Sequence, residues 1–145
     1  MWTLDAVVAF QPWLTSGIPE ALPALRVGFI EAGASWVPFL LSIYAASDRR
    51  LHHQAAGVHQ PIDAKRGLFR ESRIYVACQS QDDLPYLLQF GMEDNLLVGT
   101  DYTHADQSAE LMALDVVEQR GAVGEIPAEV ARKILEDNPR RFYGL

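Results

Sequence analysis

The chain of 145 residues contains a single cysteine, Cys78, so it cannot form an internal disulfide bond. This absence fits a protein of the reducing cytoplasm, which is where we expect it to be located. Basic residues are also few, since 12 lysines and arginines stand against 19 acidic residues and give a net charge of -7. Nucleic-acid binding needs a basic surface that neutralises phosphates, so the charge argues against a nucleic-acid partner.

Long hydrophobic runs are missing as well. None approaches the ~18 apolar residues of a membrane-spanning helix, so we expect no membrane partner. The first residues, MWTLDAVVAFQPW, have no basic flank and include Asp5, which makes them a poor signal peptide. Hydrophobic residues still make up 49% of the chain, which is enough for a core, and the length suits a single domain over residues 1–145.

Several motifs that carry known chemistry are absent from the sequence. It has no glycine-rich phosphate loop, no GxGxxG fingerprint and no GxSxG nucleophile elbow. No HxH pair occurs either, although a catalytic transition-metal site generally has histidine among three or more ligands. His52, His53 and His59 lie in an irregular polar stretch at 47–68, and we interpret them as solvated surface.

Three short apolar runs alternate with helical patterns along the chain. The runs are RVGFIEAG (26–33), RIYVACQ (73–79) and NLLVGTD (95–101). Each is typical of a strand that is buried on both faces, as strands in parallel sheets are. The alternation of strands with helices therefore predicts an α/β fold made of about three βα units, with a parallel sheet and two open edges.

The expected helices differ in how clearly they begin and end. They cover residues 3–16, a segment after Ser35, a short segment capped by Asp82 or Asp83, about 105–120, and 127 to about 137. Pro12 is expected to kink or end the first helix, and Pro139 to stop the last one. Asp106 is the predicted cap of the fourth helix, whose inward residues are predicted to be Leu111, Leu114 and Val117.

Polar side chains follow all three predicted strands. Glu31 ends the first strand, Gln79 ends the second and Asp101 ends the third. Because ligands of parallel α/β folds bind at the carboxyl ends of the strands, we expect these side chains to converge. Asp101 is placed to act as a hard metal ligand or general base, with a turn or helix cap as the alternative.

The other candidates near these strand ends each have a structural alternative. Glu31 could form an ion pair with Arg26 instead of serving chemistry. His104 could be a ligand, an acid or a substrate contact, or simply a histidine at the start of a helix. Cys78 lies inside a predicted strand, where a buried and inert thiol is the usual case.

Four segments carry a resemblance to a known family. They are RVGFIEAGASWVPFLL, RIYVACQSQDDLPYLLQFG, LLVGTDYTHAD and IPAEVARKILEDNPRRFYGL, in this order. Together they resemble the C-terminal part of the amidohydrolase-related (β/α)8-barrel family, which includes aminocarboxymuconate-semialdehyde decarboxylase and related aromatic-acid decarboxylases and hydrolases. The resemblance implies that the chain supplies strands six to eight of a TIM barrel, with the HxH or ExH pair and the fifth-strand histidine of the family lying before Met1.

The resemblance also implies roles for particular residues. In the family the last strand ends in an aspartate that ligates the metal or acts as acid or base beside it, and that position is Asp101. Glu31 occupies the place where a catalytic histidine often ends the strand two earlier. Tyr102 and His104 would line the mouth of the site and contact substrate. The implied cofactor is a divalent metal, with zinc as the first expectation and manganese as the second.

The leading expectation is therefore the C-terminal portion of a metal-dependent enzyme that is incomplete as a catalyst alone. It would hydrolyse or decarboxylate a small carboxylated or cyclic substrate. The alternative is a catalytically inactive, truncated α/β domain that is stabilised by forming a homo-oligomer, because open sheet edges are best covered by another copy. A third arrangement is a missing N-terminal half-barrel on a separate chain that completes the site.

Overall fold

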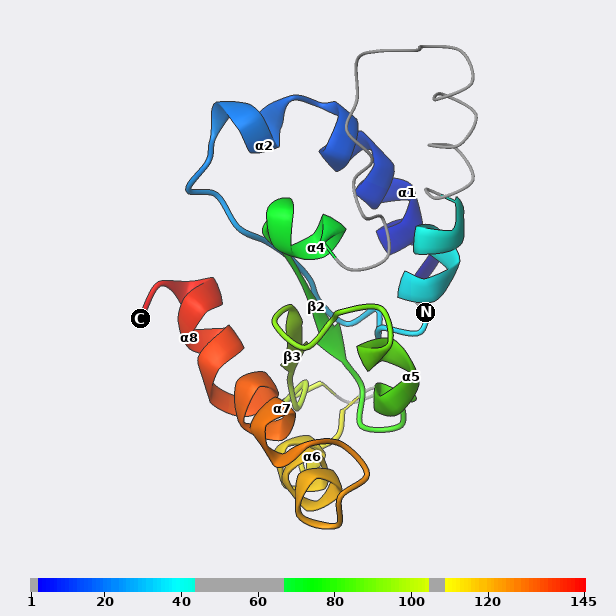
Figure 1. The fold of residues 1–145 in the computed structure, drawn as a ribbon, viewed down its shortest axis with the longest axis vertical. Coiled ribbons are helices and arrows are strands. Elements are labelled where there is room, and N and C mark those ends of the chain that lie inside the picture. The colour runs from blue at the N-terminus through cyan, green and yellow to red at the C-terminus, as the bar shows by residue number, and fades with distance from the viewer. Residues whose placement is uncertain (1–2, 44–66, 105–108) are drawn as a thin grey trace.

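The computed structural model describes residues 3–43, 67–104 and 109–145 (Figure 1). Its elements are α1 (Thr3–Thr15), α2 (Ile18–Ala21), β1 (Val27–Phe29), a helical segment at 37–43, α4 (Leu68–Glu71), β2 (Ile74–Cys78), α5 (Leu84–Leu88), β3 (Leu96–Val98), α6 (Ala113–Ala122), α7 (Ala128–Arg132), the π-helical η1 (Lys133–Asp137) and α8 (Asn138–Tyr143). Nearly all of the expected irregular stretch at 47–68 lies outside the described residues. No helix in the described ranges is both long and apolar enough to span a membrane.

The three strands form one parallel sheet in the order β1-β2-β3, as the sequence predicts. Val27 pairs with Ile74, and Val76 pairs with Leu96. All of β2 is buried, as expected for the central strand of a covered sheet. In the described part of the chain, β1 and β3 each pair on one side only, so the sheet has the two open edges that were expected.

The main hydrophobic core lies on one face of the sheet. Ile74, Val76 and Cys78 point to this face, where residues from α1, the 37–43 segment and the C-terminal helices meet them. The Phe10 ring of α1 is at the centre, with its centroid 5.9 Å from Phe29, 5.9 Å from Trp36 and 5.2 Å from Phe69. Burial of these rings stabilises the fold and joins α1 to β1 and α4.

The opposite face of the sheet has a much smaller apolar cluster. Tyr75, Ala77 and Leu97 form it, and Phe142 of α8 packs against them. The Phe142 and Tyr75 ring centroids are 5.2 Å apart. A Cβ at Gly28 would lie 2.8 Å from the Phe142 ring, so glycine is needed at this position for α8 to approach β1.

The fourth predicted helix begins later than expected, at Ala113, and its predicted inward face is partly wrong. Val117 is fully buried, but Leu111 is 63% exposed and Leu114 is 45% exposed. The buried stripe of α6 consists of small residues at i, i+4 and i+8: Ala113, Val117 and Gly121. Small side chains are buried here because α7 packs closely against α6. Hydrophobicity alone predicts instead that Leu111 and Leu114 are buried. The proposed cap Asp106 lies outside the described residues.

Neither proline ends its helix. Helix α1 continues through Pro12 to Thr15. Pro139 was expected to stop the last helix, and this prediction is wrong, because α8 continues to Tyr143. Pro139 lies in the first turn of α8, where a missing N–H is tolerated. The preceding turn is π-helical, and the Asn138 N–H donates to the Lys133 carbonyl five residues back.

Candidate active site

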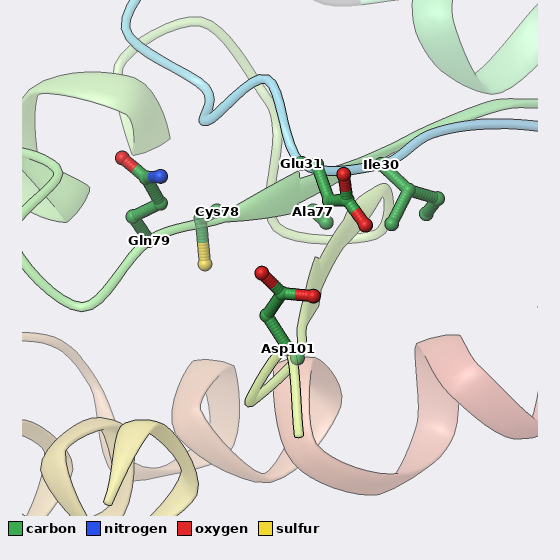
Figure 2. Close-up of a pocket in the computed structure, with 7 residues that line it drawn as sticks. Ile30, Glu31, Ala77, Cys78, Gln79 and Asp101 are labelled. Carbon is green, nitrogen blue, oxygen red and sulfur yellow. The ribbon is translucent and has the colours of Figure 1, made fainter. Parts of the chain in front are cut away.

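A small cavity of about 80 Å³ lies at the carboxyl ends of the strands (Figure 2). It is lined by Ile30, Glu31, Ala77, Cys78, Gln79, Gly99 and Asp101. The structure therefore brings Glu31, Gln79 and Asp101 to one place, as the parallel topology predicted. Figure 2 shows the Glu31 and Asp101 carboxylates on facing sides of this cavity.

Glu31 and Asp101 share an unusual backbone conformation. Their φ angles are 63° and 50°, in the left-handed region. A left-handed backbone costs a non-glycine residue roughly 1–2 kcal/mol, although aspartate adopts it more readily than most residues. Each residue turns the chain sharply just after its strand, and the side chain lines the cavity. Such strained positions are common where a side chain is held for binding or catalysis.

Asp82 connects the loops that carry two of the cavity residues. It is 8% exposed, and its Oδ2 accepts hydrogen bonds from the Ala34 N–H at 2.8 Å and the Gln79 N–H at 2.9 Å. The sequence offered Asp82 and Asp83 as alternative caps of α5, and the structure assigns the cap to Asp83, which accepts from the Tyr86 N–H at 3.0 Å. The positioning role of Asp82 was not predicted. The sequence did contain a signal for it, because one helix needs only one capping residue and two adjacent acids precede α5.

The loops after β2 and β3 are also joined to each other and to α6. Arg120 Nη1 donates to the carbonyls of Ser80 at 2.8 Å and Asp82 at 2.9 Å. The Ser80 hydroxyl donates to the Glu110 carboxylate, and the Glu110 N–H donates to the Thr100 carbonyl at 2.9 Å. These bonds fix the second and third strand ends relative to one another. The loops that form the rim of the cavity are therefore held in place.

His104 and Tyr102 are placed differently from each other. His104 Nδ1 lies 2.9 Å from Asp101 Oδ2, so the structure brings the imidazole to the candidate aspartate. The His104 N–H also donates to the Asp101 carbonyl at 3.1 Å, which closes a turn. Tyr102 is 74% exposed and is not among the residues that line the cavity.

Two further candidates have structural explanations. Burial raises the pKa of the Cys78 thiol to about 12, and the nearby Asp82 carboxylate adds to the shift. The thiol is therefore protonated at neutral pH and unsuited to act as a nucleophile. Glu31 does not pair with Arg26, because Arg26 precedes β1 and lines a different cavity at the other end of the sheet.

The sequence model of the Amidohydrolase family matches residues 2–145. The chain belongs to the amidohydrolase family. A crystal structure of an amidohydrolase from Mycobacterium avium subsp. paratuberculosis K-10 matches with a TM-score of 0.62 and 24% identity, over 87% of this chain and 30% of that chain. This likeness shows the fold alone, in which the small parallel sheet corresponds to part of a TIM barrel. This amidohydrolase chain therefore corresponds to only 30% of the length of the Mycobacterium avium protein. No curated protein matched the chain.

The amidohydrolase family generally binds divalent metal ions, so the donor atoms of this cavity matter. Glu31 and Asp101 offer carboxylate oxygens. The Gln79 amide points away from these two carboxylates (Figure 2), and its oxygen accepts a hydrogen bond from Gln81 Nε2 at 3.0 Å. Within residues 3–43, 67–104 and 109–145, no three His, Cys, Asp or Glu side chains are grouped closely enough to hold a metal ion. The described residues therefore do not form a complete metal site by themselves.

Proposed function

We propose that this amidohydrolase chain supplies one side of an active site that hydrolyses or decarboxylates a small carboxylated or cyclic substrate. The observation that carries the proposal is that Glu31, Gln79 and Asp101 follow three neighbouring parallel strands and line one cavity. In this proposal the chain corresponds to strands six to eight of the barrel, and the histidine ligands come from residues outside this chain.

Asp101 is the proposed centre of the chemistry. Its carboxylate accepts a proton during the reaction or binds a divalent metal shared with those other residues, zinc in the first instance and manganese in the second. His104 lies 2.9 Å from the same carboxylate and orients it. The Glu31 carboxylate faces the same cavity, where it contacts the substrate.

The test compares Asp101→Asn with Asp115→Asn, a matched change at an exposed position on α6. Asparagine tolerates the left-handed backbone. The free energy of unfolding of Asp101→Asn, measured in urea, should therefore match the wild-type value within about 0.5 kcal/mol. Zinc and manganese bound after equilibrium dialysis are measured by mass spectrometry. Because this chain supplies only part of the ligand set, we expect the wild type and Asp115→Asn to retain the same small amount of metal, and Asp101→Asn to retain less.

Equal amounts of metal in the wild type and in Asp101→Asn, including none in either, would contradict the role of Asp101 as a metal ligand. Unfolding of Asp101→Asn would show instead that this aspartate only forms the turn.

A second candidate function rests on the open sheet edges. Among the described residues, β1 and β3 each pair on one side, and the face around Tyr75 is covered by Phe142. An inactive α/β domain that self-associates would cover these edges. Sedimentation tests this: a concentration-dependent dimer that contains no metal favours the structural role, whereas a monomer at all concentrations rejects it.

A further inference from the structure

A second cavity lies at the amino ends of the strands, opposite the Glu31–Asp101 cavity. Its volume is about 330 Å³. Four arginines line it, and they come from four places in the chain: Arg26 before β1, Arg70 in α4, Arg73 before β2 and Arg141 in α8. The size lies at the lower end of the range for small-ligand pockets.

The charge of this cavity is opposite to the charge of the whole chain. The chain carries -7, whereas the cavity has four guanidinium groups and one carboxylate, Asp94. Asp94 Oδ1 lies 2.9 Å from Lys133 Nζ and 4.0 Å from Arg141 Nη1. The hydrogen bond to Asp94 raises the pKa of Lys133, so that pair stays ionised. Asp94 is therefore shared among cations and leaves the cavity positive.

Arg73 has a structural role, whereas Arg26 and Arg70 are available to bind a ligand. The Arg73 guanidinium donates to the carbonyls of Leu25 at 3.1 Å, Glu71 at 3.2 Å and Pro19. Arg26 and Arg70 are exposed, and in the described parts of the chain neither makes a hydrogen bond or ion pair through its side chain. A guanidinium presents a planar fork of donors that matches the oxygens of a carboxylate or phosphate.

A buried amide in the same cavity lacks a partner on one side. Asn95 is 2% exposed, and its Nδ2 donates to the Ile74 carbonyl at 2.8 Å. Its Oδ1 is buried and has no hydrogen-bond partner. Because this oxygen has almost no accessible surface, a ligand in the cavity does not reach it. The ligand-binding groups of the cavity are therefore the cationic donors.

We propose that this cavity binds a small organic oxyanion, whose phosphate or carboxylate group is held by Arg26 and Arg70. Arg141 lies on the same cavity and adds to the positive field. The site is at the opposite end of the sheet from Asp101, so it does not depend on the proposed active site. It gives the domain a second ligand-binding position.

The test uses inorganic pyrophosphate and citrate as separate probes in isothermal titration at physiological ionic strength. The variants are Arg26→Gln and Arg70→Gln. The matched control is Arg132→Gln, which removes an exposed arginine that pairs with Asp137 on α7 and η1. We expect at least one probe to bind with one-to-one stoichiometry, and each cavity variant to weaken binding about tenfold. Arg132→Gln and Asp101→Asn should bind like the wild type.

The two probes distinguish the acid group, because a preference for pyrophosphate indicates a phosphate ligand and a preference for citrate indicates a carboxylate. Failure of both probes to bind would overturn the proposal. So would an equal loss in Arg132→Gln, which would mean that general surface charge causes the binding. Thermal melts of the variants should match the wild type, since neither Arg26 nor Arg70 makes a described contact that folding requires. Failure of pyrophosphate and citrate to bind would not change the metal-binding result for Asp101→Asn, so the two proposals can fail separately.

Discussion

Replacing Asp82 with alanine is expected to destabilise the chain more than any other single acidic substitution near the active site. Asp82 Oδ2 accepts two backbone hydrogen bonds, a buried one at 2.8 Å and a partly buried one at 2.9 Å. Hydrogen bonds to charged groups contribute about 1.5–3 kcal/mol each, and unpaired buried N–H groups add to the loss. Because the two bonds share one acceptor and water can enter the adjacent cavity, we expect the lower end for the pair, about 3 kcal/mol.

Urea unfolding followed by circular dichroism measures this loss, with two variants for comparison. Asp82→Asn keeps one acceptor oxygen and loses only the charge, so it should cost about 1–2 kcal/mol. Asp83→Ala removes the cap of α5, a single exposed hydrogen bond, and should cost about 1 kcal/mol. If Asp82→Ala costs no more than Asp83→Ala, then Asp82 does not join the two loops and the reasoning about the cavity rim is refuted.

Two further predictions follow from the packing. Because burial holds the pKa of Cys78 at about 12, iodoacetamide should not modify it at neutral pH until urea unfolds the chain; rapid modification of the folded protein would contradict this. The raised pKa favours the folded state below the ordinary thiol value of 9.0, and this contribution is lost as the pH rises toward about 12. Gly121→Ala would place a Cβ 2.6 Å from the Ala131 Cβ. It should lower stability by about 1–3 kcal/mol in a thermal melt, whereas Gly99→Ala, which meets nothing within 4 Å, should not.

The positions of the three strands were predictable because each is a short apolar run that ends in a polar residue. Gly99 and Asp101 after β3 make this boundary plain in the sequence. The inward face of α6 was not predictable in the same way. Leu111 and Leu114 are the more hydrophobic side chains, yet α7 approaches at Gly121 and leaves them exposed. Packing distance between two helices is a tertiary property that hydrophobicity does not encode.

The convergence of Glu31, Gln79 and Asp101 was predictable from topology, since parallel strands place their carboxyl ends together. The left-handed backbone at Glu31 and Asp101 was not, because neither is a glycine. The arginine-lined cavity was also missed. Its side chains are spread from Arg26 to Arg141, and no local pattern joins residues that far apart.

The position of α8 has a consequence for the order in which the domain folds. Asn138 Nδ2 donates to the Leu96 and Glu93 carbonyls at the edge strand, and Phe142 packs across Gly28 and Tyr75. One helical turn therefore contacts all three strands, although it follows all of them in the sequence. We expect these contacts to form late, because Phe142 and Gly28 are far apart in the sequence and closing such a long loop costs entropy. The sheet can associate strand by strand, but until this turn docks, its second face stays uncovered and open to aggregation.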